Sequence, residues 1–202
     1  MKRLYENIED INISGGIDQL SEVVRTIDKS LQNIANNTDQ LVEYLAKYSN
    51  SNKGAQYEKV IRTSMYLRDE LFDAALELND MQKQIVAYQN KIYRYEDMSE
   101  SAQQPNPYLI TKRQISVENS ITQFNQSDMM EVVEILRNYS ERVHHHIKMI
   151  EEKKNSIAAV WRDTQYDDFA EFIDEVTGKI NDAIKLFEEY VNYLEEKIKE
   201  LS

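Results

Sequence analysis

Four long segments of the chain place an apolar residue alternately every three and four positions, which is the spacing of one face of an α-helix. These segments are residues 17–48, 57–95, 129–161 and 169–201. The second is the strictest, since Ser64 alone interrupts its apolar run. A straight helix drifts by about 20° per heptad from a 3.5-residue repeat, so a stripe of this length stays in contact only if the helices supercoil. The pattern predicts four long helices in left-handed, coiled-coil-like packing.

The first segment is flanked by typical signals for the start and the end of a helix. Ser14 precedes it as a candidate N-cap, and the polar run 49–54, which ends in Lys-Gly, predicts a turn after it. Residues before Ser14 show no clear period. Ile8, Ile11 and Ile13 are nevertheless expected to pack a short strand or turn against a helix end.

The region between the second and third segments reads as a crossover. It contains Pro105 and Pro107, which predict that the second helix is stopped there, because proline cannot continue a helix and restricts the residue before it. The β-branched stretch 110–117 predicts extended or irregular structure. The expected plan is therefore a first helical hairpin over 14–98, a crossover linker over 99–127, and a second hairpin over 128–202.

Each hairpin alone would leave one broad apolar face in water. Packing the two hairpins on each other gives an all-α protein, in which two long antiparallel helical hairpins form an elongated four-helix bundle or coiled coil. Self-association of the same faces between copies is the alternative way to bury them. The sequence does not distinguish these two arrangements, because the apolar stripes look alike in both.

Composition supports the helical prediction and narrows the function. The 202 residues include 41% apolar and 30% charged residues, enough to fold in water, but only 4 Gly and 2 Pro. Such low use of turn residues excludes sandwiches, barrels and most glycine-looped enzymes. The formal charge of −12 argues against nucleic acid and anionic membrane surfaces as partners. No cysteine is present, which removes disulfides, cysteine zinc sites and cysteine nucleophiles.

The start of the chain does not resemble a secretory signal peptide. Two basic residues are followed by Glu6, Glu9 and Asp10, where an apolar core would be needed. No run of 18 apolar residues occurs. The sequence therefore predicts a cytoplasmic protein, or one secreted without a cleaved signal peptide.

Motifs for chemistry are sparse. Glu141 and His144 have the spacing of a di-iron bundle ligand pair, but such a centre needs two pairs, and all histidines of the chain are the consecutive His144 to His146. Consecutive side chains fan out around one helix, so a solvated cluster is the preferred interpretation. No nucleophile elbow, P-loop, dinucleotide fingerprint or zincin motif occurs. We expect no catalytic residue, cofactor, metal site or small-molecule substrate, and no enzyme.

Polar groups interrupt the apolar stripes at several places. Thr38, Ser64 and Ser140 are expected to fix the register of the helices, as polar layers do in coiled coils. Lys154 is expected to extend its ammonium from the edge of a stripe to water.

The chain has 13 tyrosines. Five of them lie on the stripes: Tyr48, Tyr57, Tyr88, Tyr95 and Tyr190. Because a buried phenol needs a hydrogen-bond partner, these tyrosines are expected at bundle ends or interfaces, and ordinary filling of the amphipathic core is the alternative.

The turn of the second hairpin contains the one distinctive motif. The single Trp of the chain, Trp161, ends the third segment, and Phe169 opens the stripe of the fourth, eight residues later. The indole is expected to clamp the turn while Phe169 packs beneath it. Asp163 or Thr164 can cap the following helix, because Ser, Thr, Asp and Asn side chains accept hydrogen bonds from its first free N–H groups.

This arrangement resembles the W-x-G family of helical-hairpin proteins associated with type VII (ESX-like) secretion. Trp161 and Phe169 match the Trp and the apolar residue eight positions later, whereas Asp163 stands where the family has Gly. The resemblance covers 128–202 directly and implies pairing of hairpins into a four-helix bundle and export as a folded body. Under it, Trp161, Asp163, Tyr166 and Phe169 are the candidate hairpin-turn and interaction residues.

Two candidate functions follow, which differ in where the protein acts. The first is a non-enzymatic helical-bundle interaction protein that resembles type VII secretion W-x-G proteins and acts as a secreted or secretion-associated binding partner. The alternative is an intracellular coiled-coil scaffold or adaptor that oligomerises. In both, the expected partner is another protein or a second copy of this chain.

Overall fold

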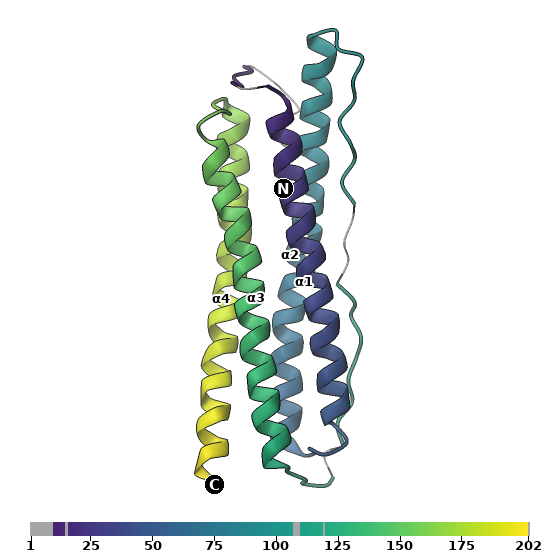
Figure 1. The fold of residues 1–202 in the computed structure, drawn as a ribbon, viewed down its shortest axis with the longest axis vertical. Coiled ribbons are helices and arrows are strands. Elements are labelled where there is room, and N and C mark those ends of the chain that lie inside the picture. The colour runs from purple at the N-terminus through teal and green to yellow at the C-terminus, as the bar shows by residue number, and fades with distance from the viewer. Residues whose placement is uncertain (1–9, 15, 107–109, 119, 202) are drawn as a thin grey trace. The chain divides into compact units, whose positions relative to one another are not determined.

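The computed structural model describes residues 10–14, 16–106, 110–118 and 120–201 (Figure 1). Within these ranges the chain forms four α-helices and no strand, with only two isolated β-bridges. The helices are α1 (Asp18–Tyr48), α2 (Ala55–Tyr95), α3 (Gln126–Ile157) and α4 (Thr164–Glu200). The prediction of an all-α helical bundle is confirmed. No helix in the described part of the chain is both long and apolar enough to cross a bilayer.

Two compact units divide the chain, and each draws one segment from every helix. The first unit consists of Met1–Gln32, Ala74–Leu109 and His146–Gly178, and the second of Asn33–Asp73, Ile110–His145 and Lys179–Ser202. The first unit thus holds the start of α1, the end of α2, the end of α3 and the start of α4. The two helices of each hairpin therefore run antiparallel, as expected, whereas α2 and α3 run in the same direction and are joined by the long crossover.

The predicted apolar stripes form the cores of both units. In the first unit the buried side chains include Leu20, Val24, Ile27, Leu78, Met81, Ile85, Ile92, Ile150, Ile157 and Ile173. In the second unit they include Ile34, Leu41, Leu45, Val60, Leu67, Leu71, Val133, Leu136, Ile180 and Phe187. Burying a side chain of this size contributes roughly 1.5–3 kcal/mol, so these stripes supply the main driving force for the bundle.

The polar interruptions of the stripes are buried and paired. Thr38 Oγ1 donates to the Ile34 carbonyl at 2.8 Å, and Ser64 Oγ donates to the Val60 carbonyl at 2.9 Å. Ser140 Oγ donates to Glu188 Oε1 at 3.0 Å. Each hydroxyl thus has the partner that a buried polar group needs. Their role in helix register stays a prediction.

A second buried face of α2 escaped the search for apolar periodicity, because much of it is polar. In the first unit, Gln82 Nε2 donates to the Val24 carbonyl at 3.0 Å and to Asp28 Oδ1 at 2.6 Å. Gln89 lies one heptad further on. Its Nε2 donates to Ser21 Oγ at 2.8 Å, so α2 binds α1 partly through side-chain amides.

Helix α2 ends well before the prolines that were expected to stop it. After Tyr95 the backbone turns at Asp97, whose φ is +51°, and the Met98 N–H donates to the Tyr93 carbonyl at 2.9 Å. This is a Schellman-type end, in which a left-handed residue satisfies the last free carbonyls. The expectation that Pro105 stops α2 is wrong, because local hydrogen bonding ends the helix first. Tyr95 itself is 76% exposed and does not belong to the core stripe.

The N-terminal segment pairs with the turn of the second hairpin. Ile13 forms an antiparallel bridge with Trp161, and the Ser14 N–H donates to the Val160 carbonyl at 2.7 Å. Ser14 therefore does not cap α1, which begins at Asp18. The expected packing holds for Ile13, whereas Ile11 is 41% exposed. Ile8 lies outside the described residues.

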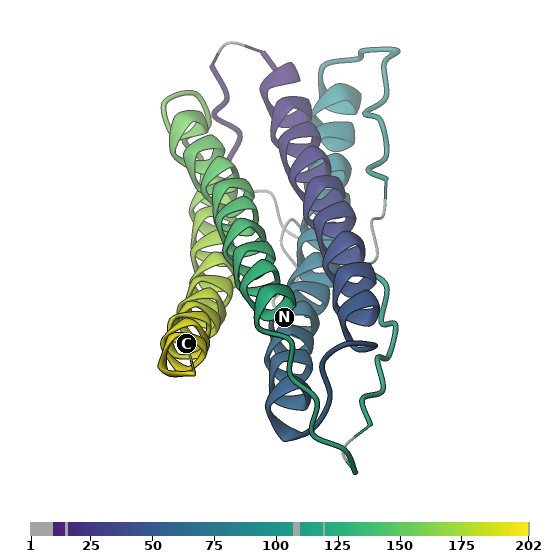
Figure 2. The same ribbon diagram turned by 60° about the horizontal axis from the view of Figure 1, so that its bottom comes forward.

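The described parts of the crossover between α2 and α3, residues 96–106, 110–118 and 120–125, contain no helix (Figures 1 and 2). In the second unit it is held against α2 at several points. Ile110 is buried, Lys112 Nζ lies 4.0 Å from the centre of the Phe72 ring, and buried Arg68 donates to the Arg113 carbonyl at 2.6 Å. The extended or irregular structure expected for this stretch is what the structure shows over 110–118.

The start of α2 requires a glycine. Gly54 has a φ of +94°, a conformation that other residues rarely adopt. A Cβ at this position would lie 3.1 Å from the Ile121 carbonyl oxygen, so the crossover also approaches too closely for a side chain. The turn predicted over 49–54 is present.

Candidate functional site

The carboxylate of Asp163 organises the turn between α3 and α4, in the first unit. Helix α4 begins at Thr164, so Asp163 is its N-cap. Oδ1 accepts hydrogen bonds from the backbone N–H groups of Gln165, at 3.1 Å, and Tyr166, at 3.3 Å. These are two of the N–H groups that a helix start leaves without intrahelical partners. Of the two predicted caps, the structure selects Asp163.

The same carboxylate binds two aromatic side chains and the N-terminal segment. Trp161 Nε1 donates to Oδ1 at 2.6 Å, and the Tyr88 hydroxyl donates to Oδ2 at 2.5 Å. The Asn12 N–H also donates to Oδ2, at 3.1 Å. Five donors thus converge on a side chain of which only 2% is exposed. A buried carboxylate is stable only with such compensation, since desolvation of an unpaired charge is costly.

Around this carboxylate the aromatic rings form a continuous stack. Trp161 is fully buried and lies between Tyr88, at 5.7 Å between ring centres, and Phe169, at 5.4 Å. Tyr166 meets the indole edge-on at 5.8 Å, and its hydroxyl donates to the Lys154 carbonyl at 3.2 Å. Burial raises the pKa of the Tyr166 phenol. The structure therefore brings all four candidate turn residues into one cluster.

Sequence reasoning found the four turn residues of this cluster but did not assign Tyr88 or Asn12 to it. Tyr88 and Asn12 lie far from the turn along the chain, and nothing in the local spacing links them to it. The one available signal was the requirement that a buried tyrosine on the stripe have a hydrogen-bond partner, which for Tyr88 is Asp163. Because both carboxylate oxygens accept hydrogen bonds and the indole is buried, Asp163 and Trp161 stabilise the turn.

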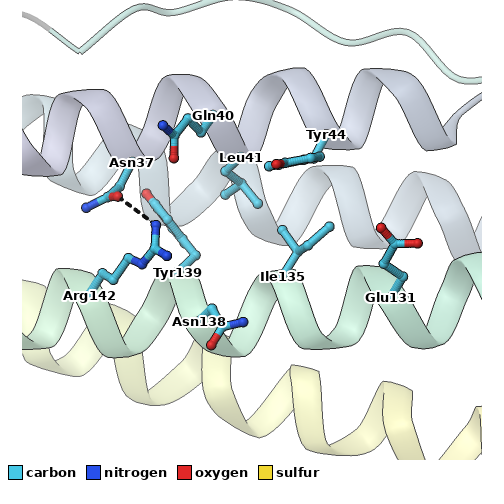
Figure 3. A pocket seen from close by; sticks show the side chains of 9 residues that line it. All are labelled: Asn37, Gln40, Leu41, Tyr44, Glu131, Ile135, Asn138, Tyr139 and Arg142. Atoms are coloured by element: carbon cyan, nitrogen blue, oxygen red, sulfur yellow. Dashed lines mark hydrogen bonds between the residues drawn. The ribbon is translucent and has the colours of Figure 1, made fainter.

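An open groove lies between α1 and α3 in the second unit (Figure 3). Its volume is about 260 Å³. It is lined by Asn37, Gln40, Leu41 and Tyr44 of α1 and by Glu131, Ile135, Asn138, Tyr139 and Arg142 of α3. Figure 3 places Glu131 and Arg142 at opposite ends, with Leu41 and Asn138 between them.

The floor of the groove is buried, and most side chains of its walls are polar. Leu41 and Tyr139 are 2% and 4% exposed, whereas Tyr44 is 44% exposed. The Tyr139 hydroxyl lies 2.9 Å from Thr38 Oγ1, and burial raises the pKa of this phenol, which is therefore neutral at pH 7. Arg142 Nη1 donates to Asn37 Oδ1 at 3.3 Å. These groups can form hydrogen bonds and charge pairs with a docked surface.

A second hollow, of about 360 Å³, lies at the C-terminal end of α4 in the same unit. Apolar side chains form most of its wall: Tyr57, Phe124, Met129, Leu194, Ile198 and Leu201. The lysines at its rim are already paired, Lys53 with Glu118 at 3.1 Å and Lys197 with Glu200 at 2.6 Å. The hollow therefore presents apolar surface, and the charges of these two lysines are already engaged in ion pairs.

The remaining candidate groups do not form a site in the described part of the chain. Glu141 and His144 are both exposed on α3. Within the described ranges, no group of three or more His, Cys, Asp or Glu residues is placed to hold a metal ion. Lys154 contacts Asp174 and keeps only 12% of its side chain exposed, so its ammonium pairs with α4 instead of extending into water.

Comparison of the chain with family models, with curated proteins and with solved structures found no match.

Proposed function

We propose that this chain is a non-enzymatic helical-bundle interaction protein that resembles the type VII secretion W-x-G proteins and acts as a secreted or secretion-associated binding partner. The observation that carries the proposal is the packing of Trp161 on Phe169 across the α3–α4 turn, at 5.4 Å. These are the two positions that carry the resemblance.

The departure of Asp163 from the family's glycine is compatible with this proposal. The positive-φ residues other than glycine in the described ranges are limited to Asp97, so the backbone at Asp163 does not need glycine's freedom. The carboxylate of Asp163 caps α4 and binds the indole. These hydrogen bonds stabilise the tight turn in place of a glycine.

Export is tested directly in a bacterium with a type VII secretion system. The full chain with a C-terminal tag should appear in the culture supernatant at its unprocessed mass, and should be absent from the supernatant when the system is deleted. A cytosolic marker protein controls for lysis. Retention of the intact, folded chain in the cells of both strains would exclude export by this system.

The second candidate is an intracellular scaffold that oligomerises. It is favoured by the complete burial of Trp161, because the turn motif then has a structural role and needs no receptor. This function predicts a stable oligomer, or a co-purifying partner, in the cytosolic fraction. The fractionation experiment above separates the two, since the same sample reports both destinations.

A further inference from the structure

The walls of the α1–α3 groove belong to a helical stripe that faces away from the core. On α3 it consists of Glu131, Ile135, Asn138 and Arg142, spaced by four, three and four residues. On α1 it consists of Asn37, Gln40 and Tyr44, spaced by three and four. This is the spacing that brings side chains of one helix against another in coiled coils. The groove thus has the periodicity of a helix-packing surface with exposed side chains.

The charges of this stripe are arranged so that a reversed copy complements them. Glu131 and Arg142 lie about 16 Å apart along α3, at 1.5 Å per residue, and occupy opposite ends of the groove (Figure 3). Consider a two-fold axis that lies in the interface, perpendicular to the helices, at the level midway between Glu131 and Arg142. This axis exchanges the two ends of the groove. It sets α3 antiparallel to α3 of a second copy and places each Glu131 opposite an Arg142.

The α1 side of the groove is compatible with the same axis. Gln40 lies near the midpoint between Asn37 and Tyr44, so it faces its own copy, and a side-chain amide can both donate to and accept from another amide. Asn37 then faces Tyr44 of the second copy, whose ring is the most exposed apolar surface of the groove wall. The same axis sets Ile135 opposite Asn138 of the second copy, so complementarity rests on the pairing of Glu131 with Arg142 and of Gln40 with its own copy.

We propose that the α1–α3 groove joins two copies of this chain in a two-fold symmetric, antiparallel dimer, with Glu131 of each copy paired with Arg142 of the other. The groove carries one acid and one base, so neither a basic nor an acidic partner is favoured by net charge, whereas a second copy supplies the same pair in reversed order. The chain's charge of −12 opposes association, but this repulsion is screened beyond about 8 Å at physiological salt. The proposal rests on the proposed function as an interaction protein and names its partner.

Solution mass is the first test. Light scattering coupled to gel filtration at 0.15 M salt should give twice the chain mass of 23.8 kDa at micromolar concentration. Glu131→Arg and Arg142→Glu should each give the monomer mass, because each homodimer then opposes like charges. An equimolar mixture of the two variants should return to the dimer mass, since every like pair is replaced by an opposite one.

The controls are matched charge changes on α4, Glu189→Arg and Lys185→Glu, which should leave the dimer intact. All four substituted side chains are exposed, and circular dichroism verifies that each variant stays helical. A monomeric wild type overturns the proposal. It is equally overturned by a dimer that survives both groove variants, or by a mixture of the two that stays monomeric.

Cross-linking tests the position of the axis. Since the chain has no cysteine, Gln40→Cys introduces its only thiol. Mild oxidation should convert this variant to a disulfide-linked dimer, at least about tenfold faster than the matched variant Glu189→Cys. Equal rates for the two variants would place the axis elsewhere and contradict the pairing of Glu131 with Arg142.

These outcomes are separable from those for the proposed function. If the protein is exported but monomeric, the proposed function stands and the proposed dimer is contradicted. A dimer that obeys the charge exchange but stays in the cytosol retains this one and favours the scaffold.

Discussion

Trp161 and Asp163 are joined side chain to side chain within one turn, the indole Nε1 donating to the Asp163 carboxylate at 2.6 Å. The residue that departs from the W-x-G pattern is thus the residue that holds the tryptophan. Because the same carboxylate caps α4, the conformation of the turn and the position of the indole depend on a single side chain.

Truncation of the indole should destabilise the protein strongly. Trp161→Ala removes a fully buried ring that contacts Tyr88 and Phe169, and large-to-small core substitutions of this kind cost about 3–5 kcal/mol. Urea unfolding monitored by circular dichroism measures the change. The control is Tyr95→Ala, an exposed aromatic for which about 0.5 kcal/mol or less is expected. A loss under about 1 kcal/mol for Trp161→Ala would show that the indole is exposed in solution.

Removal of the Asp163 charge should have a similar effect without changing volume. Asp163→Asn replaces acceptor oxygen by an amino group and leaves buried donors unpaired, at a cost of about 2–4 kcal/mol. Asp167→Asn, in the exposed first turn of the same helix, should cost about 0.3–1 kcal/mol through the helix dipole. If the two variants unfold at the same urea concentration, the Asp163 carboxylate does not stabilise the turn more than an exposed carboxylate does.

The attachment of the crossover to α2 should depend on Arg68. Its buried guanidinium donates to the Arg113 carbonyl at 2.6 Å and to Asp69 Oδ1 at 2.8 Å. Losing a hydrogen bond from a charged donor costs about 1.5–3 kcal/mol, equivalent to roughly tenfold or more in local opening. Arg68→Gln should therefore raise the rate of tryptic cleavage after Lys112 and Arg113 about tenfold, as followed by mass spectrometry.

Arg62→Gln is the matched control for this experiment. Arg62 lies on the same helix, but its guanidinium forms an exposed pair with Glu58 at 2.6 Å. Its substitution removes one arginine without touching the crossover, and the cleavage rate at residues 112 and 113 should not change. Equal acceleration in both variants would mean that Arg68 does not hold the segment.

The ion pair between α1 and α3 of the first unit should make stability depend on pH. The hydrogen bond and charge of Lys153 Nζ, 2.6 Å from Glu22 Oε2, hold the pKa of Glu22 below its usual value. The stabilisation is therefore complete above the unfolded-state pKa of about 4.3 and is lost as the pH falls through the lower folded-state value.

Glu22→Gln should accordingly lower Tm slightly at pH 7, and this difference from the wild type should shrink as the pH falls toward 3. Thermal unfolding across this range, followed by circular dichroism, measures the difference. Glu43→Gln, an exposed substitution on the same helix, is the matched control. A Glu22→Gln deficit that persists unchanged at pH 3 would rule out the ion pair as its cause.

The apolar stripes were sufficient to predict four helices and most of the core, because a helix buries a fixed face and apolar residues must recur on it. Residues such as Leu67, Leu78 and Ile180 are buried as their spacing requires. The turn cluster was predicted in part for the same reason, since Trp161 and Phe169 share one local hairpin.

Positions held by polar contacts were not predictable in this way. Gln82 and Gln89 are buried because α1 supplies their partners, and α2 ends at Tyr95 because Asp97 adopts a left-handed conformation. A periodic pattern records which side chains avoid water, but it contains no information on which distant group accepts a hydrogen bond.

The sequence by itself thus determined the helices, their apolar faces and the local meeting of Trp161 with Phe169, because each depends on spacing along one helix or one turn. Only the tertiary structure decided that Asp163 binds Tyr88 and Asn12, since these contacts join residues that lie far apart in the chain. Only the tertiary structure, likewise, placed Glu131 and Arg142 at the two ends of one groove with α1 as its other wall. Hydrogen bonds and grooves depend on which helices pack together, whereas apolar periodicity depends only on the helix that carries it.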